Sequence, residues 1–381
     1  MKRILLLGAS GSIGQQTLDV IASNHNDFSL VAFSVGEKVD TISKILRTHP
    51  EVKYVCIKHK EYIDILKKQF PMVTFFSGDQ GLIKIVRKVE CDLVVNALVG
   101  FAGFPPTIAA LKKKRTICLA NKESLVIGGE IVNRLLKKGF GKIYPIDSEH
   151  VAIAKCLSRT ELNRVEKIIL TASGGAFRDL TIEQMAQVTP QDALKHPTWQ
   201  MGSKITIDSA TMMNKGFEII EAYYLFGFPL DKIEVLMHDE SYVHSLVKLK
   251  DGGFLAEVSK PDMRTPIAYA LYEGQNQFEV TSADTIDSLG PYHFRPFASD
   301  RYPCVSLAKQ ALIKGGTALS VLNASNEVAV YAFLENRLPF LMISKIIEKE
   351  INNVKVKKQT IRNVIQADKK TRLHLRKVLG N

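Results

Sequence analysis

The chain has 381 residues, with 51 Lys and Arg against 39 Asp and Glu, which gives a formal net charge of +12 at pH 7. Apolar residues make up 46% and charged residues 24%, a balance typical of a globular protein that excludes a disordered chain, a collagen-like repeat and a coiled coil. No run of 18 apolar residues occurs, so we expect no membrane span. The five cysteines are widely spaced and form no CxxC pair, which predicts reduced thiols in a cytosol-like compartment.

The first 147 residues alternate short apolar runs with amphipathic stretches. We expect strands at residues 3–8, 29–35, 54–57, 92–98, 116–119 and 142–146. Helical patterns lie between several of these strands, at residues 13–23, 39–47 and 60–69. Such alternation predicts an α/β domain with a parallel sheet that is wrapped by helices.

A glycine-rich turn follows the first expected strand and opens the first expected helix. Gly8, Gly11 and Gly14 have the spacing GxxGxxG. Glycines there let the backbone approach a pyrophosphate, whose charge is held by the N–H groups at the start of the helix. The turn therefore predicts dinucleotide binding by a Rossmann-like sheet. The alternative is a tight turn that binds nothing.

The end of the second expected strand bears on the choice between NAD and NADP. An Asp or Glu about 20 residues beyond the glycines would hold the ribose 2′-hydroxyl of NAD. In this chain the strand ends without a carboxylate, and Gly36, Glu37 and Lys38 follow it. The missing acid and the nearby cation favour NADP, whereas Glu37 keeps NAD open as the alternative.

Polar residues follow the last two strands of this domain, at the sheet edge where ligands bind in open α/β folds. Asn121, Lys122 and Glu123 follow the first of these strands, and an exposed loop is the alternative interpretation. Asp147 and Glu149 follow the second. In an extended segment residues i and i+2 point the same way, so we expect the two carboxylates to converge. All-oxygen ligands favour Mg²⁺ or Mn²⁺, and a solvated loop is the alternative.

A helix is expected at residues 210–226, with Asp208 or Ser209 as its N-cap. Gly216 lies inside this helix, where a glycine costs about 1 kcal/mol, so we expect something to pack closely against it.

Three polar residues of the same helix, Asn214, Lys215 and Glu218, are spaced three or four apart and share one face. This face could complete a site with the two acids at 147 and 149. The alternative is an ordinary solvated Lys–Glu pair.

Two further segments carry candidate ligand contacts. Ser173 lies in a turn of small residues after a strand expected at 167–171, which suits phosphate binding. Trp199, the only tryptophan, lies in a polar stretch that begins at His196, and we interpret residues 196–202 as a lid that closes over a ligand. The alternative is a core tryptophan.

The rest of the chain differs from the first domain in pattern. Residues 148–272 are predicted to form an α+β catalytic domain, residues 273–300 a linker, and residues 301–381 a helical domain. The last 31 residues hold nine Lys or Arg and one acid. Nucleic-acid binding is one interpretation of this tail, but no binding motif supports it, and a solvated helix face is the preferred one.

The motifs at residues 8–14, 120–123, 147–150, 173–175, 196–199 and 208–218 occur in this order, and with them the chain resembles the 1-deoxy-D-xylulose 5-phosphate reductoisomerases over nearly its whole length. The resemblance implies NADPH-dependent rearrangement and reduction of 1-deoxy-D-xylulose 5-phosphate to 2-C-methyl-D-erythritol 4-phosphate, in the non-mevalonate isoprenoid pathway. It also implies a divalent metal, Mg²⁺, Mn²⁺ or Co²⁺.

The resemblance further implies roles for individual residues. The metal ligands would be Asp147, Glu149 and Glu218. The catalytic residues would be Lys122, Asp147, Glu149, His196, Lys215 and Glu218. Substrate contacts would be Lys122, Ser148, Glu149, Ser173, His196, Trp199, Ser209, Asn214, Lys215 and Glu218. Cofactor contacts would be Ser10, Gly11, Ser12, Ile13, Gly36, Glu37, Lys38, Asn121, Glu123 and Gly202. The pair Glu37–Lys38 fits the family pattern least well.

A small phosphorylated sugar is the expected substrate, and a homodimer in the bacterial cytoplasm is expected from the family, with a mature plastid form as an alternative. We expect neither a nucleic-acid nor a membrane partner. Two other functions compete: another NADP-dependent oxidoreductase of a small phosphorylated substrate, which would need no metal, and a non-catalytic NADP sensor or scaffold.

Overall fold

A computed structural model of the chain describes residues 1–195, 201–275, 285 and 290–380. These residues form two compact units. The first comprises the described residues of Met1–Ser124, Val132–Asp147 and Asp262–Thr281, and the second comprises those of Leu125–Ile131, Ser148–Pro261 and Ser282–Asn381.

The first unit is built on a seven-stranded parallel sheet, as the alternating pattern predicts. Its strands, in spatial order, are β4 (Thr74–Ser77), β3 (Tyr54–Ile57), β2 (Phe28–Val35), β1 (Lys2–Leu7), β5 (Leu93–Asn96), β6 (Thr116–Leu119) and β7 (Lys142–Pro145). Strand β4, an edge strand of four residues, was not predicted. The order reverses between β1 and β5, and ligands bind at such a switch point in open α/β sheets.

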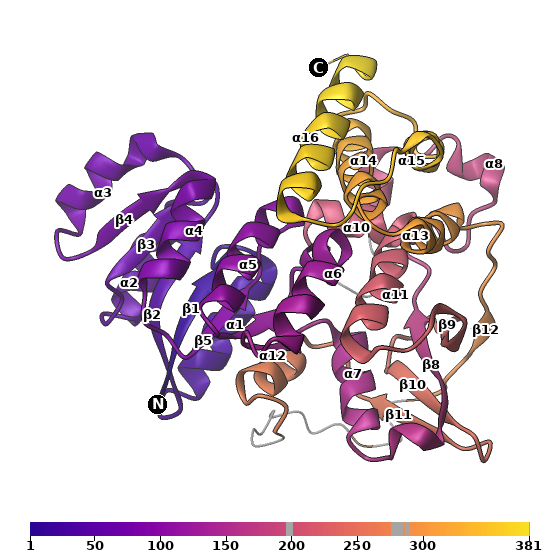
Figure 1. Cartoon of the computed structure of the whole chain (residues 1–381), viewed down its shortest axis with the longest axis horizontal. Helices are drawn as coiled ribbons and strands as arrows, with labels where there is room; N and C mark the ends of the chain where they lie inside the picture. Colours follow the sequence, from indigo (N-terminus) through magenta and orange to yellow (C-terminus); the bar gives the residue numbers. More distant parts are fainter. Residues whose placement is uncertain (196–200, 276–284, 286–289, 381) are drawn as a thin grey trace. The chain divides into compact units, whose positions relative to one another are not determined.

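Helices cover both faces of this sheet (Figure 1). They are α1 (Ser12–Ser23), α2 (Thr41–Thr48), α3 (Ile63–Gln69), α4 (Gly78–Lys88), α5 (Phe104–Lys112), α6 (Glu123–Lys137) and α12 (Arg264–Leu271), with 3₁₀ turns at Lys60–Tyr62 and Gly100–Gly103. Only the two ends of α6 belong to this unit, because Leu125–Ile131 is part of the second. Right-handed crossovers place α1, α2 and α3 on one face and α4, α5 and α6 on the other.

Helix α12 packs beside α1, although it lies more than 240 residues further along the chain. Its Ile267, Ala270 and Leu271 are fully buried in the same core as Ile4 and Leu6 of β1. Burying one such side chain stabilises the fold by about 1.5–3 kcal/mol. This helix therefore belongs to the first unit, whereas the predicted boundaries place it in the central domain.

The second unit contains a mixed five-stranded sheet. Its order is β11 (Phe254–Val258), β10 (Val243–Leu249), β8 (Val165–Ala172), β9 (Ile233–Met237) and β12 (Arg295–Pro296). Only β8 and β9 run parallel, and the other pairs are antiparallel. The α+β fold class expected for residues 148–272 is confirmed.

Helices α7 (Ser148–Leu157) and α11 (Met213–Phe226) pack on this sheet, and α13 (Pro303–Lys314) packs against α11. The remaining helices are α8 (Ile182–Met185), α9 (Pro190–Ala193), α10 (Ser203–Ala210), α14 (Ala318–Leu334), α15 (Met342–Asn353) and α16 (Ile361–Val378), with 3₁₀ turns at Leu162–Arg164 and Leu230–Lys232. The residues after 303 are helical, as predicted. The predicted division into 148–272, 273–300 and 301–381 is finer than these two units.

The close packing expected at Gly216 is present. A Cβ atom at this position would lie 2.7 Å from the Cβ of Ala308 and 3.3 Å from the carbonyl oxygen of Cys304, both in α13. Contacts this short are not tolerated without a shift of the backbone. The glycine therefore lets α11 and α13 approach each other.

The predicted helix at 210–226 is interrupted. Met212 has a left-handed backbone, with φ 59°, and α11 begins only at Met213. Asp208 and Ser209 belong to the separate helix α10, so neither caps α11, and that prediction is wrong. The short helix α10 holds both side chains buried.

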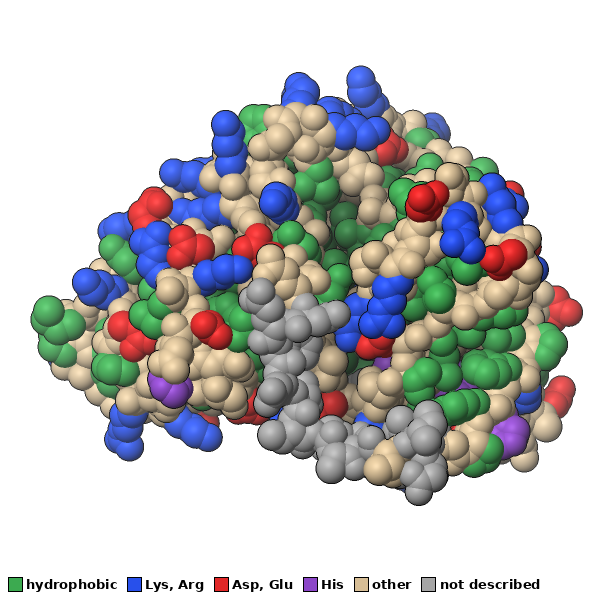
Figure 2. Space-filling view, turned by 90° about the horizontal axis from the view of Figure 1, so that it is seen from below, with side chains coloured by type: hydrophobic (Ala, Val, Ile, Leu, Met, Phe, Trp, Pro, Cys, Tyr) green, Lys and Arg blue, Asp and Glu red, His purple; other side chains and the backbone are tan. Residues whose placement is uncertain are grey.

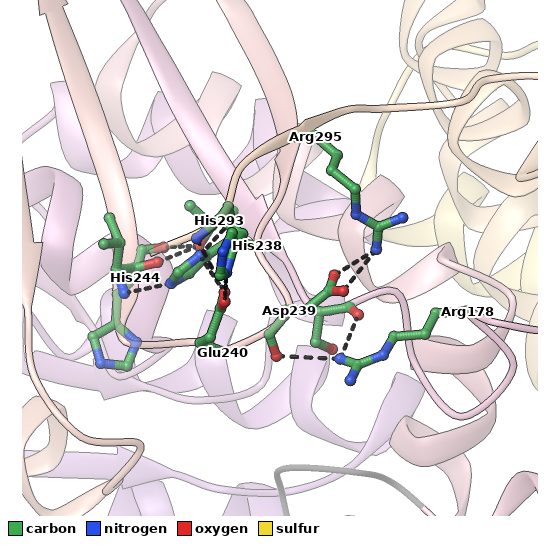
Figure 3. A network of polar contacts seen from close by, with 10 residues as sticks. Arg178, His238, Asp239, Glu240, His244, His293 and Arg295 are labelled. Carbon is green, nitrogen blue, oxygen red and sulfur yellow. Dashed lines mark hydrogen bonds and ion pairs between the residues drawn. The ribbon is translucent and has the colours of Figure 1, made fainter. Parts of the chain in front are cut away.

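Strand β12 lies within the predicted linker and is attached to the end of β9 by a polar network (Figure 3). Glu240 receives a 2.5 Å hydrogen bond from Nδ1 of His293 and lies 3.1 Å from Nδ1 of the buried His238. Arg295 binds both carboxylate oxygens of Asp239 at 2.7 Å. This part of the linker is therefore fixed to the sheet.

In the part of the chain that the structure describes, no helix has both the length and the apolar character needed to cross a membrane. Figure 2 shows Lys and Arg side chains spread over the visible face, with acidic side chains among them. Charges of both signs are therefore mixed on this face.

Candidate active site

A buried charged cluster connects two helices of the second unit. Helix α7 presents Glu149 in its first turn, and α11 presents Asn214, Lys215 and Glu218. The Lys215 ammonium donates to Glu149 Oε1 at 2.8 Å and also to the Glu218 carboxylate. The Asn214 amide donates to Glu218 Oε1 at 2.5 Å. The predicted shared face on α11 is thus present, and the solvated Lys–Glu alternative is wrong.

Two charged side chains of this cluster are buried, and burial of a charge costs free energy unless an opposite charge compensates it. Glu218 is 0% exposed and Lys215 is 4% exposed. Burial alone would lower the pKa of Lys215, but the carboxylates of Glu149 and Glu218 outweigh it and raise that pKa. Lys215 therefore stays an ammonium group, and the cluster contains two carboxylates and one cation.

The two carboxylates of this cluster suit a hard cation. One oxygen of Glu149 and one of Glu218 lie within 4.8 Å of each other. Oxygen donors at this separation match the preference of Mg²⁺ and similar divalent ions. The donor chemistry therefore fits a divalent metal.

The expected geometry of residues 147–149 needs a correction. Strand β7 ends at Pro145 and α7 begins at Ser148, so this segment is not extended. The predicted reason for the convergence of Asp147 and Glu149 is therefore wrong. Glu149 instead lies at a helix N-terminus, where the helix dipole favours a negative charge. Ser148 donates a 2.6 Å hydrogen bond to Glu149 Oε2.

The triplet at residues 121–123 of the first unit is buried. Asn121, Lys122 and Glu123 are 1%, 7% and 6% exposed, so the exposed-loop alternative is wrong. Lys122 forms an ion pair with Asp147, whose side chain is 11% exposed. The Asn121 amide donates to the carbonyls of Leu98 and Gly100 at 2.9 and 3.0 Å. These hydrogen bonds fix the loop before α5, so the Asn121 amide has a structural role whether or not it also contacts a ligand.

The glycine turn after β1 has the geometry of a dinucleotide-binding loop. A Cβ atom at Gly14 would lie 2.1 Å from the Gly8 carbonyl oxygen, so only glycine permits this close contact between helix and strand. Gly8 itself has a φ of 88°, which favours glycine. No side chain caps the N-terminus of α1, so its first N–H groups are available to a pyrophosphate. The loop therefore fits a dinucleotide cofactor.

The predicted phosphate-binding serines come from two segments that pack together. Ser173 follows β8, and its Oγ accepts a 3.4 Å hydrogen bond from Gly175 N. A Cβ atom at Gly175 would lie 2.6 Å from the carbonyl oxygen of Ser209 in α10. Gly202 is the N-cap of the same helix. His196 and Trp199 lie outside the described residues.

Two sets of buried polar contacts in the second unit were not predicted from the sequence. Lys204 pairs with Asp208 at 2.7 Å, and Asn326 of α14 donates to the same carboxylate at 2.8 Å. His150 hydrogen-bonds to the carbonyl oxygen of Glu218 at 2.9 Å, and its Nδ1 lies 3.6 Å from Glu221. The i,i+4 spacing of Lys204 and Asp208 was visible in the sequence, whereas the contact with Asn326 was not.

Sequence models of one family match three parts of the chain. The model described as 1-deoxy-D-xylulose 5-phosphate reductoisomerase matches residues 4–129, and the models of its C-terminal domains match residues 143–226 and 258–374. A Bacillus cereus (strain AH187) 1-deoxy-D-xylulose 5-phosphate reductoisomerase is 44% identical over 98% of each chain. The chain belongs to this family.

Other reductoisomerases agree in length and fold. The enzyme of Geobacillus kaustophilus (strain HTA426) is 44% identical over 100% of both chains. The solved reductoisomerase from Zymomonas mobilis in complex with NADPH has a TM-score of 0.90 and 36% identity over 99% of each chain. A solved DOX-P reductoisomerase in complex with NADPH, fosmidomycin and magnesium has a TM-score of 0.93 and 36% identity, over 100% of this chain and 98% of that one. The resemblance inferred from the motifs is confirmed.

Proposed function

We propose that the chain is an NADPH- and divalent-metal-dependent reductoisomerase that converts 1-deoxy-D-xylulose 5-phosphate to 2-C-methyl-D-erythritol 4-phosphate in isoprenoid synthesis. Full-length relatives that bear this name support the proposal. The observation that carries it is the cluster of Glu149, Lys215 and Glu218, because a reductase without a metal has no need to hold a second carboxylate, Glu149, beside the buried Glu218.

The metal would be held by Asp147, Glu149 and Glu218. When bound, it supplies a Lewis acid that polarises the oxygens of the substrate. Lys215 donates hydrogen bonds to Glu149 and to Glu218, and we propose that these bonds orient both acids toward the metal. Magnesium is present in solved relatives. Manganese and cobalt are our further proposals for this chain.

The substrate would be held largely by the second unit. We propose that Ser173, Ser209 and Asn214 bind the phosphate and thereby retain the fragment that carries it. Lys122, Ser148, His196 and Trp199 would contact the rest of the substrate, together with Glu149, Lys215 and Glu218. Among all these residues, Lys122, Asp147, Glu149, His196, Lys215 and Glu218 are the proposed catalytic ones.

NADPH would be held mainly by the first unit, and when bound it supplies the hydride. The first N–H groups of α1 would hold the pyrophosphate. The proposed contacts are Ser10, Gly11, Ser12, Ile13, Gly36, Glu37, Lys38, Asn121, Glu123 and Gly202. The functional division that we propose is 1–147 for the cofactor, 148–272 for metal and substrate with a lid at 196–202, 273–300 as linker and 301–381 as helical domain.

The setting of the enzyme is a separate proposal. We propose that the enzyme works in the bacterial cytoplasm, since curated relatives of the same length come from Bacillus and Geobacillus. The homodimer that the family resemblance implies is a further proposal. The partner that we propose for this enzyme is its substrate, a phosphorylated sugar.

The test is a spectrophotometric assay of NADPH oxidation with 1-deoxy-D-xylulose 5-phosphate as substrate. We expect oxidation that requires the sugar phosphate, stops on addition of EDTA and returns with excess Mg²⁺. Another NADP-dependent oxidoreductase of a phosphorylated substrate would continue to turn over in EDTA. Oxidation that is insensitive to EDTA would therefore replace our proposal by that alternative.

A further inference from the structure

The ends of two neighbouring strands in the first unit bring three charged side chains together. Strands β2 and β3 are parallel, with Val35 opposite Ile57, so both end at the same edge of the sheet (Figure 1). Gly36 follows β2, and its N–H donates to the Ser10 hydroxyl at 3.5 Å. The residues just beyond these two strands therefore adjoin the glycine loop.

Glu37, Lys58 and His59 form an ion cluster at this edge. The Lys58 ammonium donates to Glu37 Oε1, and His59 Nε2 lies 2.7 Å from Glu37 Oε2. The hydrogen bond from Lys58, and then that from His59, lowers the pKa of Glu37. Both carboxylate oxygens of Glu37 are thus engaged by basic side chains.

This cluster is not explained by stability. Glu37 and Lys58 are 64% and 57% exposed at their side chains, and His59 is 39% exposed. Ion pairs with this exposure contribute little to folding, because water and salt screen them. Their position beside the glycine loop suggests instead that they contact the cofactor.

That place is where dinucleotide-binding folds distinguish the two nicotinamide cofactors. A free carboxylate at the end of β2 would accept a hydrogen bond from the ribose 2′-hydroxyl of NADH, whereas a cation there accommodates the 2′-phosphate of NADPH. Glu37 taken alone predicts NADH. Since Lys58 and His59 occupy its oxygens, the edge instead contains two basic groups gathered around Glu37, and a second acid, Glu61, lies 3.6 Å from the other ring nitrogen of His59.

We propose that Lys58 and His59 form the subsite for the 2′-phosphate of NADPH, and that Glu37, which adjoins the cofactor at this subsite, does not hold it but is an internal anion that the phosphate displaces. The inference rests on the proposed use of NADPH. A phosphate monoester carries a charge of about −1.5 to −2 at pH 7, against −1 for a carboxylate, so it is the stronger partner for the same two basic groups. Glu37 then lowers the affinity for NADPH and has no contact with NADH.

The test measures cofactor binding by isothermal titration calorimetry, without substrate and without turnover. Lys58→Gln is expected to weaken NADPH binding about tenfold and to change NADH binding less than twofold. Glu37→Gln is expected to tighten NADPH binding about threefold or more and to leave NADH binding unchanged. Lys68→Gln, at another exposed lysine of the first unit, is the matched control and should change neither constant.

The outcomes separate this inference from the proposed function. Equal weakening of NADPH and NADH by Lys58→Gln, or no weakening at all, would overturn the subsite. Weaker NADH binding in Glu37→Gln would also overturn it, because Glu37 would then hold the ribose hydroxyl. A wild-type chain that binds no NADPH would refute both proposals. A wild-type chain that oxidises NADPH with the sugar phosphate, while Lys58→Gln retains its ratio of affinities, would refute the subsite alone.

Discussion

Glu218→Gln is expected to lower turnover about 10³-fold at limiting Mg²⁺ while NADPH binding stays unchanged. The substitution keeps the size of the side chain and removes the negative charge of a carboxylate that is 0% exposed. A metal acting as a Lewis acid supplies several kcal/mol to the transition state, and about 4 kcal/mol corresponds to this factor. The measurement is the initial rate of NADPH oxidation against Mg²⁺ concentration, together with a calorimetric titration of NADPH.

Glu234→Gln is the matched control for this variant. Glu234 lies in β9 of the same unit, its side chain is 49% exposed, and it pairs with Lys167 at 2.6 Å. We expect the control to keep the rate and the Mg²⁺ dependence of the wild type. If Glu218→Gln kept more than half of the wild-type rate at limiting Mg²⁺, Glu218 would no longer be a candidate ligand.

Lys215→Met is expected to destabilise the metal-free protein by about 3–5 kcal/mol, the range found when one partner of a buried ion pair is removed. The variant deprives Glu149 and Glu218 of the ammonium group that both contact, at a position that is 4% exposed. A divalent ion bound by these acids would replace part of the missing charge. We therefore expect Mg²⁺ to restore part of the lost stability, although activity stays low.

The measurement is the free energy of unfolding in urea, with EDTA and with Mg²⁺. Lys248→Met is the control, since Lys248 forms a partly exposed pair with Glu166 at 3.0 Å and should show a loss of less than about 1 kcal/mol that does not depend on Mg²⁺. An equal loss in EDTA and in Mg²⁺ for Lys215→Met would mean that no metal binds between the two acids.

Much of the fold could be predicted because the relevant signals are local. The strands of the first unit are apolar runs bounded by turns, and the glycine spacing at residues 8–14 depends on contacts within one turn. Strand β4 escaped prediction because only Phe75 and Phe76 of its four residues are apolar, which is too short an apolar run to indicate a strand. Helix α12 was not among the predicted elements, and no local feature indicated that it packs beside α1.

The site was predictable to a similar degree. The spacing of Asn214, Lys215 and Glu218 is sufficient to place them on one helical face. The left-handed Met212 could not be foreseen, because a continuous helical pattern crosses it and tertiary packing sets its backbone. The partners of Glu37 lie about 20 residues further along the chain, and only the parallel pairing of β2 and β3 brings them together.

The most direct test of the account follows the carbon skeleton of the product. With 1-deoxy-D-xylulose 5-phosphate labelled with ¹³C at its ketone carbon, rearrangement followed by reduction breaks the bond between C3 and C4, joins C4 to the labelled carbon, and reduces C3. The account predicts that the labelled carbon of the product bears the methyl group and no hydrogen in a ¹³C NMR spectrum. A labelled carbon that bears one hydrogen would show simple reduction of the ketone and would contradict the reductoisomerase activity.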